Sequence, residues 1–322
     1  MNAVVFDCEP KFVHDYPVPV PGPSEALVRV KIAGICNTDL EIVKGYSEFR
    51  GILGHEFTGT VVHAPDESKH LVGERVVGEI NCGCGTCEYC KSGLRAHCLA
   101  RQAIGIRGKN GAFAQYIVLP CENLHRLPVV VSDREAVFIE PLAAACEIQE
   151  QIMVHPGQEI LVLGDGKLGL LCALVLNLSG AGITLMGRHE NKTRIAAEQG
   201  IRTLVLNGRQ PKTKKKYDIV IEATGSSSGM ETALDLIRPR GIVVLKTTTA
   251  SRLRIDLTPV VVNEVSIVGS RCGPFRTAID VVANKRIDVT PLITAVYPMK
   301  EIGRAFGKAR RKGSLKVLID CE

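Results

Sequence analysis

The pattern of apolar and polar residues changes near Val137. Before this point, short runs rich in valine and isoleucine are separated by glycine and proline, which predicts β-strands at 25–36, 59–64, 73–80 and 112–120. From there to about Thr290, apolar runs of strand length alternate with helical stretches. The chain then returns to short irregular elements and a last strand-like run at 315–320.

The alternating part predicts a parallel sheet with helices on both faces, as in a doubly wound α/β domain. A helical stretch at 134–152 comes first. Strands are expected at 159–164, 182–187, 203–207, 217–225, 241–247 and 266–271, and helices from residue 167 and at 190–200 and 229–237. The fold class is therefore α/β, with a β-rich part preceding the doubly wound part.

Composition sets limits on this picture. The 322 residues leave room for about two domains, and 45% hydrophobic residues with a mean hydropathy of +0.12 exclude a disordered chain. The longest apolar stretch, 161–178, is interrupted by glycines and charged residues, so no membrane span is expected. The first residues lack the basic start and apolar stretch of a secretory signal, which favours a cytoplasmic protein.

The charge balance argues against a nucleic-acid partner. The net charge is only +6, from 40 Lys and Arg against 34 Asp and Glu, and the charges are scattered. Tryptophan is absent and aromatic residues make up 4%, too few for a base-stacking surface. We therefore expect a small-molecule substrate, with no nucleic acid and no membrane as partner.

Four of the twelve cysteines form a cluster with short gaps: Cys84, Cys87, Cys90 and Cys98. Inside the cell, clustered thiols usually hold metal, whereas a disulfide framework belongs to secreted proteins. Four thiolates from one loop suit a tetrahedral zinc ion and leave no open position. The spacing predicts a structural zinc site, and Cys82 has no assigned role.

A second group of possible metal ligands is spread along the chain. Cys36 lies in GICNTDLE, His55 in GHEFTG and Glu140 in FIEPLA, where a carboxylate within an apolar run needs a partner. One thiolate, one imidazole and one carboxylate would make a three-ligand zinc site with an open fourth position. Glu56 competes with Glu140 as the third ligand, and Asp39 is a candidate to orient the His55 ring.

A glycine-rich loop follows the expected strand at 159–164. Gly164-Asp165-Gly166-Lys167-Leu168-Gly169 has the form G-x-G-x-x-G, with a strand before it and an apolar helix after it. The first glycine allows the turn, the second allows the backbone to approach a pyrophosphate, and the third packs the helix on the strand. The phosphates of a dinucleotide would lie at the helix N-terminus.

The end of the next strand predicts which dinucleotide is bound. An NAD site places Asp or Glu there to hold the adenine ribose, but here Gly187 and Arg188 form the turn, followed by Lys192. An arginine attracts a 2′-phosphate that a carboxylate would repel, so NADP is predicted in preference to NAD. The alternatives are that Arg188 stacks on adenine without selecting, or that Glu190 reaches the ribose.

Together these motifs resemble the zinc-containing medium-chain dehydrogenase/reductase family of alcohol, threonine and polyol dehydrogenases. The resemblance covers nearly the whole chain, and it rests on GICNTDLEI, GHEFTG with GERV, the four-cysteine loop, EPLA, GDGKLG and IEATG. It implies a GroES-like β-rich catalytic domain plus a Rossmann domain. The expected limits are 1–138 with a C-terminal return at 288–322 for the first, and 139–287 for the second.

The resemblance also implies roles for single residues. A catalytic zinc would be held by Cys36, His55 and Glu140, with Glu56 as an exchanging ligand or a near neighbour. The four-cysteine loop would hold a structural zinc, which makes two zinc ions per chain. Thr38 would bond the substrate oxygen and start a proton relay. Glu41 stands where many members have the outer histidine of that relay. Thr224 would lie near the nicotinamide, and Ser270 would contact its carboxamide.

The predicted activity is reversible hydride transfer between an alcohol and NADP, giving a ketone or aldehyde and NADPH. One alternative is an NADPH-dependent quinone or enone reductase without catalytic zinc, in which Cys36, His55 and Glu140 are incidental. Another is a nucleic-acid-binding or regulatory protein built on the zinc loop, which the charge and aromatic content disfavour. The family resemblance further implies a homodimer or homotetramer.

Overall fold

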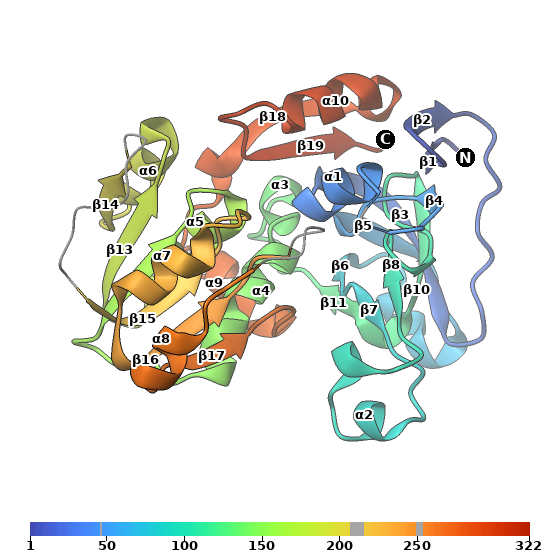
Figure 1. The fold of residues 1–322 in the computed structure, drawn as a ribbon. Coiled ribbons are helices and arrows are strands. Elements are labelled where there is room, and N and C mark those ends of the chain that lie inside the picture. Colours follow the sequence, from blue (N-terminus) through green and yellow to red (C-terminus); the bar gives the residue numbers. More distant parts are fainter. Residues whose placement is uncertain (46, 207–215, 249–253) are drawn as a thin grey trace. The chain divides into compact units, whose positions relative to one another are not determined.

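The computed structural model describes residues 1–45, 47–206, 216–248 and 254–322, which divide into two compact units (Figure 1). The first unit comprises Met1–Glu140 with Ala278–Glu322, and the second Pro141–Thr277. The helices α4 (Ile139–Gln151) and α9 (Phe275–Ala283) run through the two breaks, so no loop marks either of them. The domain limits predicted from the sequence therefore stay a prediction.

The first unit is built on a seven-stranded sheet in the order β11-β6-β5-β3-β19-β18, with β10 paired to β3. Two three-stranded sheets, β2-β1-β4 and β7-β8-β9, accompany it. The long strand β3 (Glu25–Ile35) lies at the centre of the large sheet because it pairs with β5, β10 and β19. The remaining strands are β1 (Ala3–Phe6), β2 (Pro10–Val13), β4 (Gly51–Ile52), β5 (Glu56–His63), β6 (Arg75–Gly78), β7 (Asn81–Cys82), β8 (Gln102–Ile104), β9 (Gly108–Lys109), β10 (Tyr116–Pro120), β11 (Leu124–Arg126), β18 (Ile293–Pro298) and β19 (Lys316–Asp320).

The C-terminal return completes this sheet. Strand β19 runs antiparallel to β3, with Val317 opposite Ile35 and Ile319 opposite Ala33, and parallel to β18. Its side chains Lys316 to Ile319 are all buried. A segment far along the chain thus supplies an interior strand of the first unit.

Short helices follow the strands of the first unit. They are α1 (Asn37–Val43), α2 (Glu88–Lys91), α3 (Asp133–Ala136) and α10 (Ile302–Ala309). Ser132 begins α3 with a capping box, because its hydroxyl accepts from the backbone N–H of Glu135 and the Glu135 carboxylate accepts from the Ser132 N–H. The sequence predicted one helix over 134–152. That prediction is wrong in this detail, because α3 and α4 are separated at the buried residues Val137 and Phe138.

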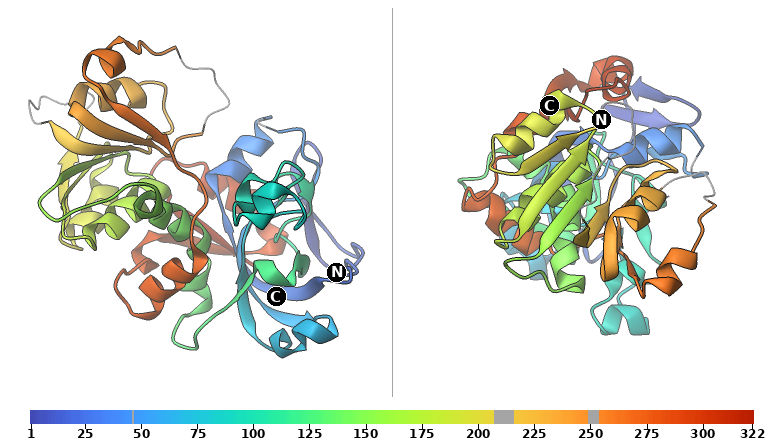
Figure 2. Two further views of the ribbon diagram at one scale, coloured as in Figure 1. Left: turned by 90° about the horizontal axis from the view of Figure 1, so that it is seen from below. Right: turned by 60° about the vertical axis from the view of Figure 1, so that its left-hand side comes forward.

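The second unit contains one six-stranded sheet in the order β14-β13-β12-β15-β16-β17, in which all neighbours are parallel. This is the strand order of a Rossmann domain. The strands point the same way in the right-hand view of Figure 2, where they run from green to yellow and orange. They are β12 (Glu159–Leu163), β13 (Gly182–Gly187), β14 (Arg202–Val205), β15 (Tyr217–Glu222), β16 (Ile237–Leu245) and β17 (Ser266–Gly269).

Apolar helices cover this sheet. Helix α5 (Lys167–Asn177) packs on β12 and β13, α6 (Glu190–Ala197) on β13 and β14, and α7 (Gly229–Leu236) on β15 and β16. Helix α8 (Thr258–Val262) precedes β17. The buried cluster around Leu161, Val220 and Val243 joins the central strands to α7. The strands predicted for this part from their apolar runs are confirmed, except that Asn207, the last residue of the strand predicted at 203–207, lies outside the described residues. Among the described residues, no helix combines the length and apolar character needed to cross a bilayer.

Candidate active site and metal centres

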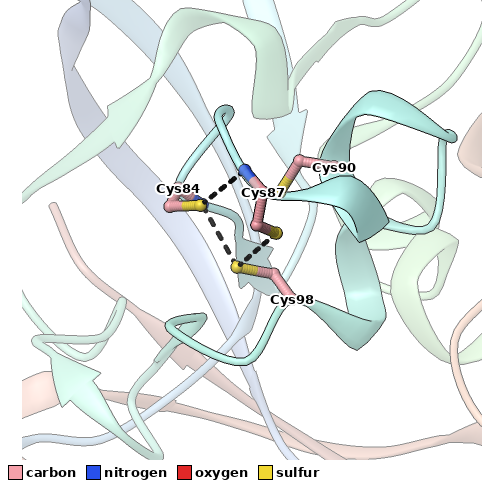
Figure 3. A group of neighbouring side chains, drawn as sticks. All are labelled: Cys84, Cys87, Cys90 and Cys98. Carbon is pink, nitrogen blue, oxygen red and sulfur yellow. Dashed lines mark hydrogen bonds between the residues drawn. The ribbon is translucent and has the colours of Figure 1, made fainter.

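The four cysteines of the loop lie together, as Figure 3 shows, with every pair of sulfur atoms within 4.8 Å. Cys87 precedes the short helix α2, and Cys98 is fully buried. The Sγ atoms of Cys87 and Cys98 are 3.7 Å apart. Four thiol sulfurs at such distances match a tetrahedral zinc ion, with about 2.3 Å from each sulfur to the metal.

The backbone of this loop stabilises thiolates. The N–H groups of Cys84 and Cys87 each point at a neighbouring sulfur, at 3.4 Å. Hydrogen bonds from Thr86, Cys87 and Cys98 lower the pKa of Cys84 to about 5, so its ligand form is the form present at neutral pH. Gly83 is required beside it, because a Cβ there would lie 2.9 Å from the Cys90 sulfur.

Cys36, His55 and Glu56 form a second group, whose ligand atoms lie within 4.8 Å of one another. Cys36 follows β3 and begins α1, while His55 and Glu56 stand at the start of β5. The antiparallel pairing of β3 with β5 brings these positions together, since Gly34 lies opposite Glu56. His55 and Glu56 are buried, and Cys36 is half-buried.

Asp39 lies beneath this group and is fully buried. Its carboxylate accepts from the N–H groups of Cys36, at 2.8 Å, and Gly54, at 3.2 Å, and it lies 3.6 Å from the His55 Nδ1. Burial alone would lower the pKa of His55, but the charges of Asp39 and Cys36 raise it to about 10, and Glu140 adds to the shift. The surroundings of the ring thus favour a positive charge, which suits a metal cation.

The two candidate third ligands differ in their surroundings. Glu56 belongs to the group of three and forms a buried ion pair with Lys316 Nζ. Glu140, the second residue of α4, is not within 4.8 Å of all the other donors, yet it is near enough for its charge to raise the pKa of His55. Which carboxylate binds the metal stays a prediction.

The expected relay residues lie on α1. The Thr38 Oγ1 is 3.7 Å from the Cys36 sulfur, so the hydroxyl stands beside the second metal group. Glu41 is one turn further along and forms an ion pair of 2.7 Å with Lys44. The structure thus places Thr38 against a donor of the metal group and Glu41 against Lys44.

Both groups fit zinc by their donor chemistry. Four thiols fit a closed structural site, whereas a thiol, an imidazole and a carboxylate fit a site with a free position. The His55 Nδ1 is a buried atom without a hydrogen-bond partner, and the Asp39 carboxylate lies 3.6 Å from it, so this polar ring is buried with a need for a further partner that a metal would meet. In the zinc-independent alternative Cys36, His55 and Glu140 are incidental, and the zinc content per chain distinguishes it from the zinc-dependent enzyme.

The glycine loop has the geometry that a dinucleotide requires. Gly164 has φ +113°, and a Cβ there would lie 2.4 Å from the Ala223 carbonyl oxygen. A Cβ at Gly169 would lie 2.0 Å from the Gly164 carbonyl oxygen. A Cβ at Gly166, by contrast, would meet nothing within 4 Å, which leaves open space at the N-terminus of α5, where Lys167 and Leu168 form the first turn. That space fits a pyrophosphate.

The turn after β13 holds a feature that the sequence reasoning missed. The Asp165 carboxylate, from the glycine loop, accepts from the backbone N–H groups of Arg188 and His189, both at 2.6 Å. Gly187 is required because a Cβ there would lie 2.5 Å from Asp165. Arg188 is exposed and Lys192 is buried in the first turn of α6. The signal was an acidic residue inside the glycine motif itself.

The other two predicted cofactor residues lie at the carboxyl ends of β15 and β17. The Thr224 N–H donates to Glu222 at 2.9 Å, and its hydroxyl donates to the same carboxylate at 2.5 Å. The Ser270 hydroxyl lies 3.1 Å from Lys246 Nζ, which is buried and also donates to the Ala144 carbonyl. Both hydroxyls are therefore held in place by a charged neighbour.

Lys316 is the second residue that the sequence reasoning missed. It lies on β19 with no exposed surface, bonded to Glu56 and 5.5 Å from the centre of the Phe138 ring. The available signal was a lysine inside the apolar run LKVLI, where a charge is costly without a partner.

Comparisons with known proteins place these features in a family. Residues 22–129 match the alcohol dehydrogenase GroES-like domain, and residues 135–321 match the glucose dehydrogenase C-terminus. The chain is 28% identical to a sorbitol dehydrogenase of Halalkalibacterium halodurans over 326 residues, covering 95% of this chain and 94% of that one. It is 30% identical to an L-threonine 3-dehydrogenase of Cutibacterium acnes over 329 residues, covering 96% and 94%.

Solved structures show the same fold. One is described as a zinc-binding dehydrogenase of Sinorhizobium meliloti bound to NADP, with a TM-score of 0.89, 28% identity, and coverage of 99% of this chain and 98% of that one. Another, described as a short chain alcohol dehydrogenase of E. coli complexed with NADH, has a TM-score of 0.91, 26% identity and coverage of 99% of both chains.

The chain belongs to the zinc-type medium-chain dehydrogenase family, with a GroES-like unit and a Rossmann unit. It is an alcohol dehydrogenase-like oxidoreductase that acts on a small molecule. The fold, the family and the class of enzyme predicted from the sequence are confirmed.

Proposed function

We propose that the protein transfers hydride reversibly between an alcohol and NADP, with one catalytic and one structural zinc. The meeting of Cys36, His55 and a buried carboxylate within 4.8 Å carries this proposal. When bound, zinc lowers the pKa of an alcohol hydroxyl, and the nicotinamide accepts the hydride from the carbon.

The chain's own residues hold the reacting groups. The Thr38 hydroxyl, beside the Cys36 sulfur, accepts a hydrogen bond from the alcohol and would pass its own proton outward along the relay as it takes up the proton that the alcohol loses. Asp39 orients the His55 ring while its oxygens are fixed by two backbone N–H groups. Thr224 and Ser270 lie at strand ends in the Rossmann unit, where the nicotinamide half of a dinucleotide is expected. Glu41 is proposed as the outer member of the relay.

Support for NADP comes from the end of β13, where Gly187 and Arg188 stand in place of Asp or Glu, with Lys192 following in the first turn of α6 next to Glu190. The Sinorhizobium relative was solved with NADP. The open space above Gly166 receives the pyrophosphate.

The test is a panel of simple alcohols, polyols and hydroxy amino acids, with NADPH formation followed by absorbance and zinc measured on the same sample. We expect turnover with at least one class and two zinc ions per chain. Cys36→Ala is expected to lose one zinc and nearly all turnover. The control Cys8→Ala changes an exposed thiol of the same unit and is expected to keep two zinc ions per chain and full turnover. Full turnover of Cys36→Ala with one zinc would favour the reductase without catalytic zinc.

The structural zinc has its own test. Cys90→Ser is expected to lose one zinc and to unfold more easily, because the loop then lacks one of its four ligands. The activity that remains at low temperature is expected to depend on the folded fraction alone. Unchanged zinc content in Cys90→Ser would contradict the assignment.

We further infer a cytoplasmic homodimer or homotetramer. None of the twelve cysteines, all of which the structure describes, forms a disulfide, and this is the state that a reducing compartment maintains. Light scattering of the purified protein measures the mass, and a monomer at micromolar concentration would contradict the oligomer.

A further inference from the structure

The Asp165 side chain reaches from the glycine loop to the turn that follows β13. Its Oδ2 accepts from the N–H groups of Arg188 and His189 at 2.6 Å, and both carboxylate oxygens lie 3.1 Å from the His189 Nδ1. Asp165 is only 7% exposed. The absence of a Cβ at Gly187 is what lets the carboxylate approach the turn this closely.

This turn is where a Rossmann domain meets the adenine ribose, since it follows the second strand of the sheet. An NAD site needs a carboxylate there to accept the ribose hydroxyls, and the strand end itself lacks one. The glycine loop supplies it instead. Asp165 of the glycine loop therefore places a negative charge against a turn in which Arg188 and Lys192 are positive, and Glu190 adds a second carboxylate at the start of α6.

The charges in this turn oppose one another in their effect on the cofactor. Arg188 and Lys192 attract a 2′-phosphate, whereas the Asp165 carboxylate repels it and accepts from a 2′-hydroxyl. Burial alone would raise the pKa of Asp165, but hydrogen bonds from His189 and Arg188 keep it below the usual value, so the group is ionised at neutral pH. The carboxylate also occupies two backbone N–H groups that could otherwise bind a phosphate.

We propose that Asp165 is a specificity-determining residue that keeps NAD as a usable second cofactor and limits the preference for NADP. The inference rests on the proposed NADP-dependent function and refines it. The expected wild-type behaviour is binding of both dinucleotides, with dissociation constants within about tenfold of each other, because attractive and repulsive charges share one turn.

The test is Asp165→Asn, because the amide oxygen can still accept from the two N–H groups while the charge is lost. Dissociation constants for NADP⁺, NAD⁺, 2′,5′-ADP and 5′-AMP are measured by calorimetry. We expect affinity for NADP⁺ and 2′,5′-ADP to rise by about tenfold, the order of effect of removing one like charge from a partly solvated phosphate site. Affinity for NAD⁺ and 5′-AMP is expected to fall.

Glu198→Gln is the matched control. It removes an exposed carboxylate at the far end of α6, the helix that follows the turn, and is expected to change each constant less than twofold. The thermal midpoint of Asp165→Asn checks that the turn is intact. An unchanged ratio of the two affinities, or weaker NADP⁺ binding in a folded Asp165→Asn, would overturn the inference, since Asp165 would then only hold the turn.

The outcomes also separate the inference from the proposed function. A wild-type protein that binds neither dinucleotide contradicts the proposed function. A protein that binds and uses NADP, but whose preference over NAD exceeds about a hundredfold, contradicts only the role of Asp165.

Discussion

Replacing Lys316 by Met should destabilise the first unit strongly. The Lys316 ammonium and the Glu56 carboxylate are 0% and 1% exposed, so water does not screen either charge. Met has a similar length, but it removes the ammonium that faces the Phe138 ring and leaves the Glu56 carboxylate buried without its cation. Removal of one partner of a buried ion pair costs about 3–5 kcal/mol.

The assay must report on each unit separately, because a two-unit protein need not unfold in one step. Hydrogen exchange followed by mass spectrometry does so, with peptides from β5 and β19 against peptides from β12 as an internal reference. A loss of 3–5 kcal/mol corresponds to exchange faster by about a hundredfold or more in the first unit, if its amides exchange through unfolding of that unit. Peptides from β12 are expected to keep their rate.

Two further variants complete the experiment. In Lys316→Met/Glu56→Gln both charges are absent, so the first unit should recover at least about 2 kcal/mol relative to Lys316→Met alone. Lys300→Met changes an exposed lysine of the same C-terminal segment and should stay within about 0.5 kcal/mol of the wild type. If Lys316→Met cost less than about 1 kcal/mol, or if the double variant were the weakest, the reasoning from the buried pair would be refuted.

Three smaller changes test other features. Burial alone would raise the pKa of Asp133, but the ion pairs with Lys31 and Arg75 lower this pKa, so the stabilisation by the Asp133 carboxylate is present above pH 4 and disappears as the pH falls through the lowered pKa. Urea unfolding of Asp133→Asn should show a loss of about 1 kcal/mol in the free energy of unfolding at pH 7 and no loss near pH 2. An equal loss at both pH values would contradict this. Ser132→Ala removes the cap of α3 and should cost about 1 kcal/mol in the same assay, with no change counting against the cap. Gly169→Ala places a Cβ 2.0 Å from a carbonyl oxygen of its own loop, so dinucleotide affinity should fall at least about tenfold by calorimetry, and retained affinity would show that the loop can adjust.

Much of the fold could be predicted because periodicity is a local property. The run EILVL has the apolar content of a buried strand, and β12 occupies those residues. The strands β7 and β9, with two residues each, have no such pattern and were not predicted. The break between α3 and α4 was missed for a related reason, since the apolar residues Val137 and Phe138 fit a continuous helix as well as a junction between two.

The site residues likewise fall into those marked by a local sequence pattern and those brought together by tertiary structure. The four-cysteine loop is local, so its spacing alone brought it to notice. The second metal group depends on pairing between β3 and β5, which only a family resemblance could suggest. Asp165 and Lys316 were missed because each acts on a residue distant in the sequence, Arg188 in one case and Glu56 in the other. A charge that must be paired is visible in a sequence, whereas its partner is not.

The position of β19 has a consequence for how the protein is made. The ribosome synthesises β3 and β5 early and completes the entire Rossmann unit before it reaches residues 316–320. Before β19 is synthesised, the part of β3 from Ile32 to Ile35 lacks its partner strand and Glu56 lacks the Lys316 ammonium. The Rossmann unit can therefore fold on the nascent chain, whereas the first unit can complete its sheet only after β19 has been synthesised.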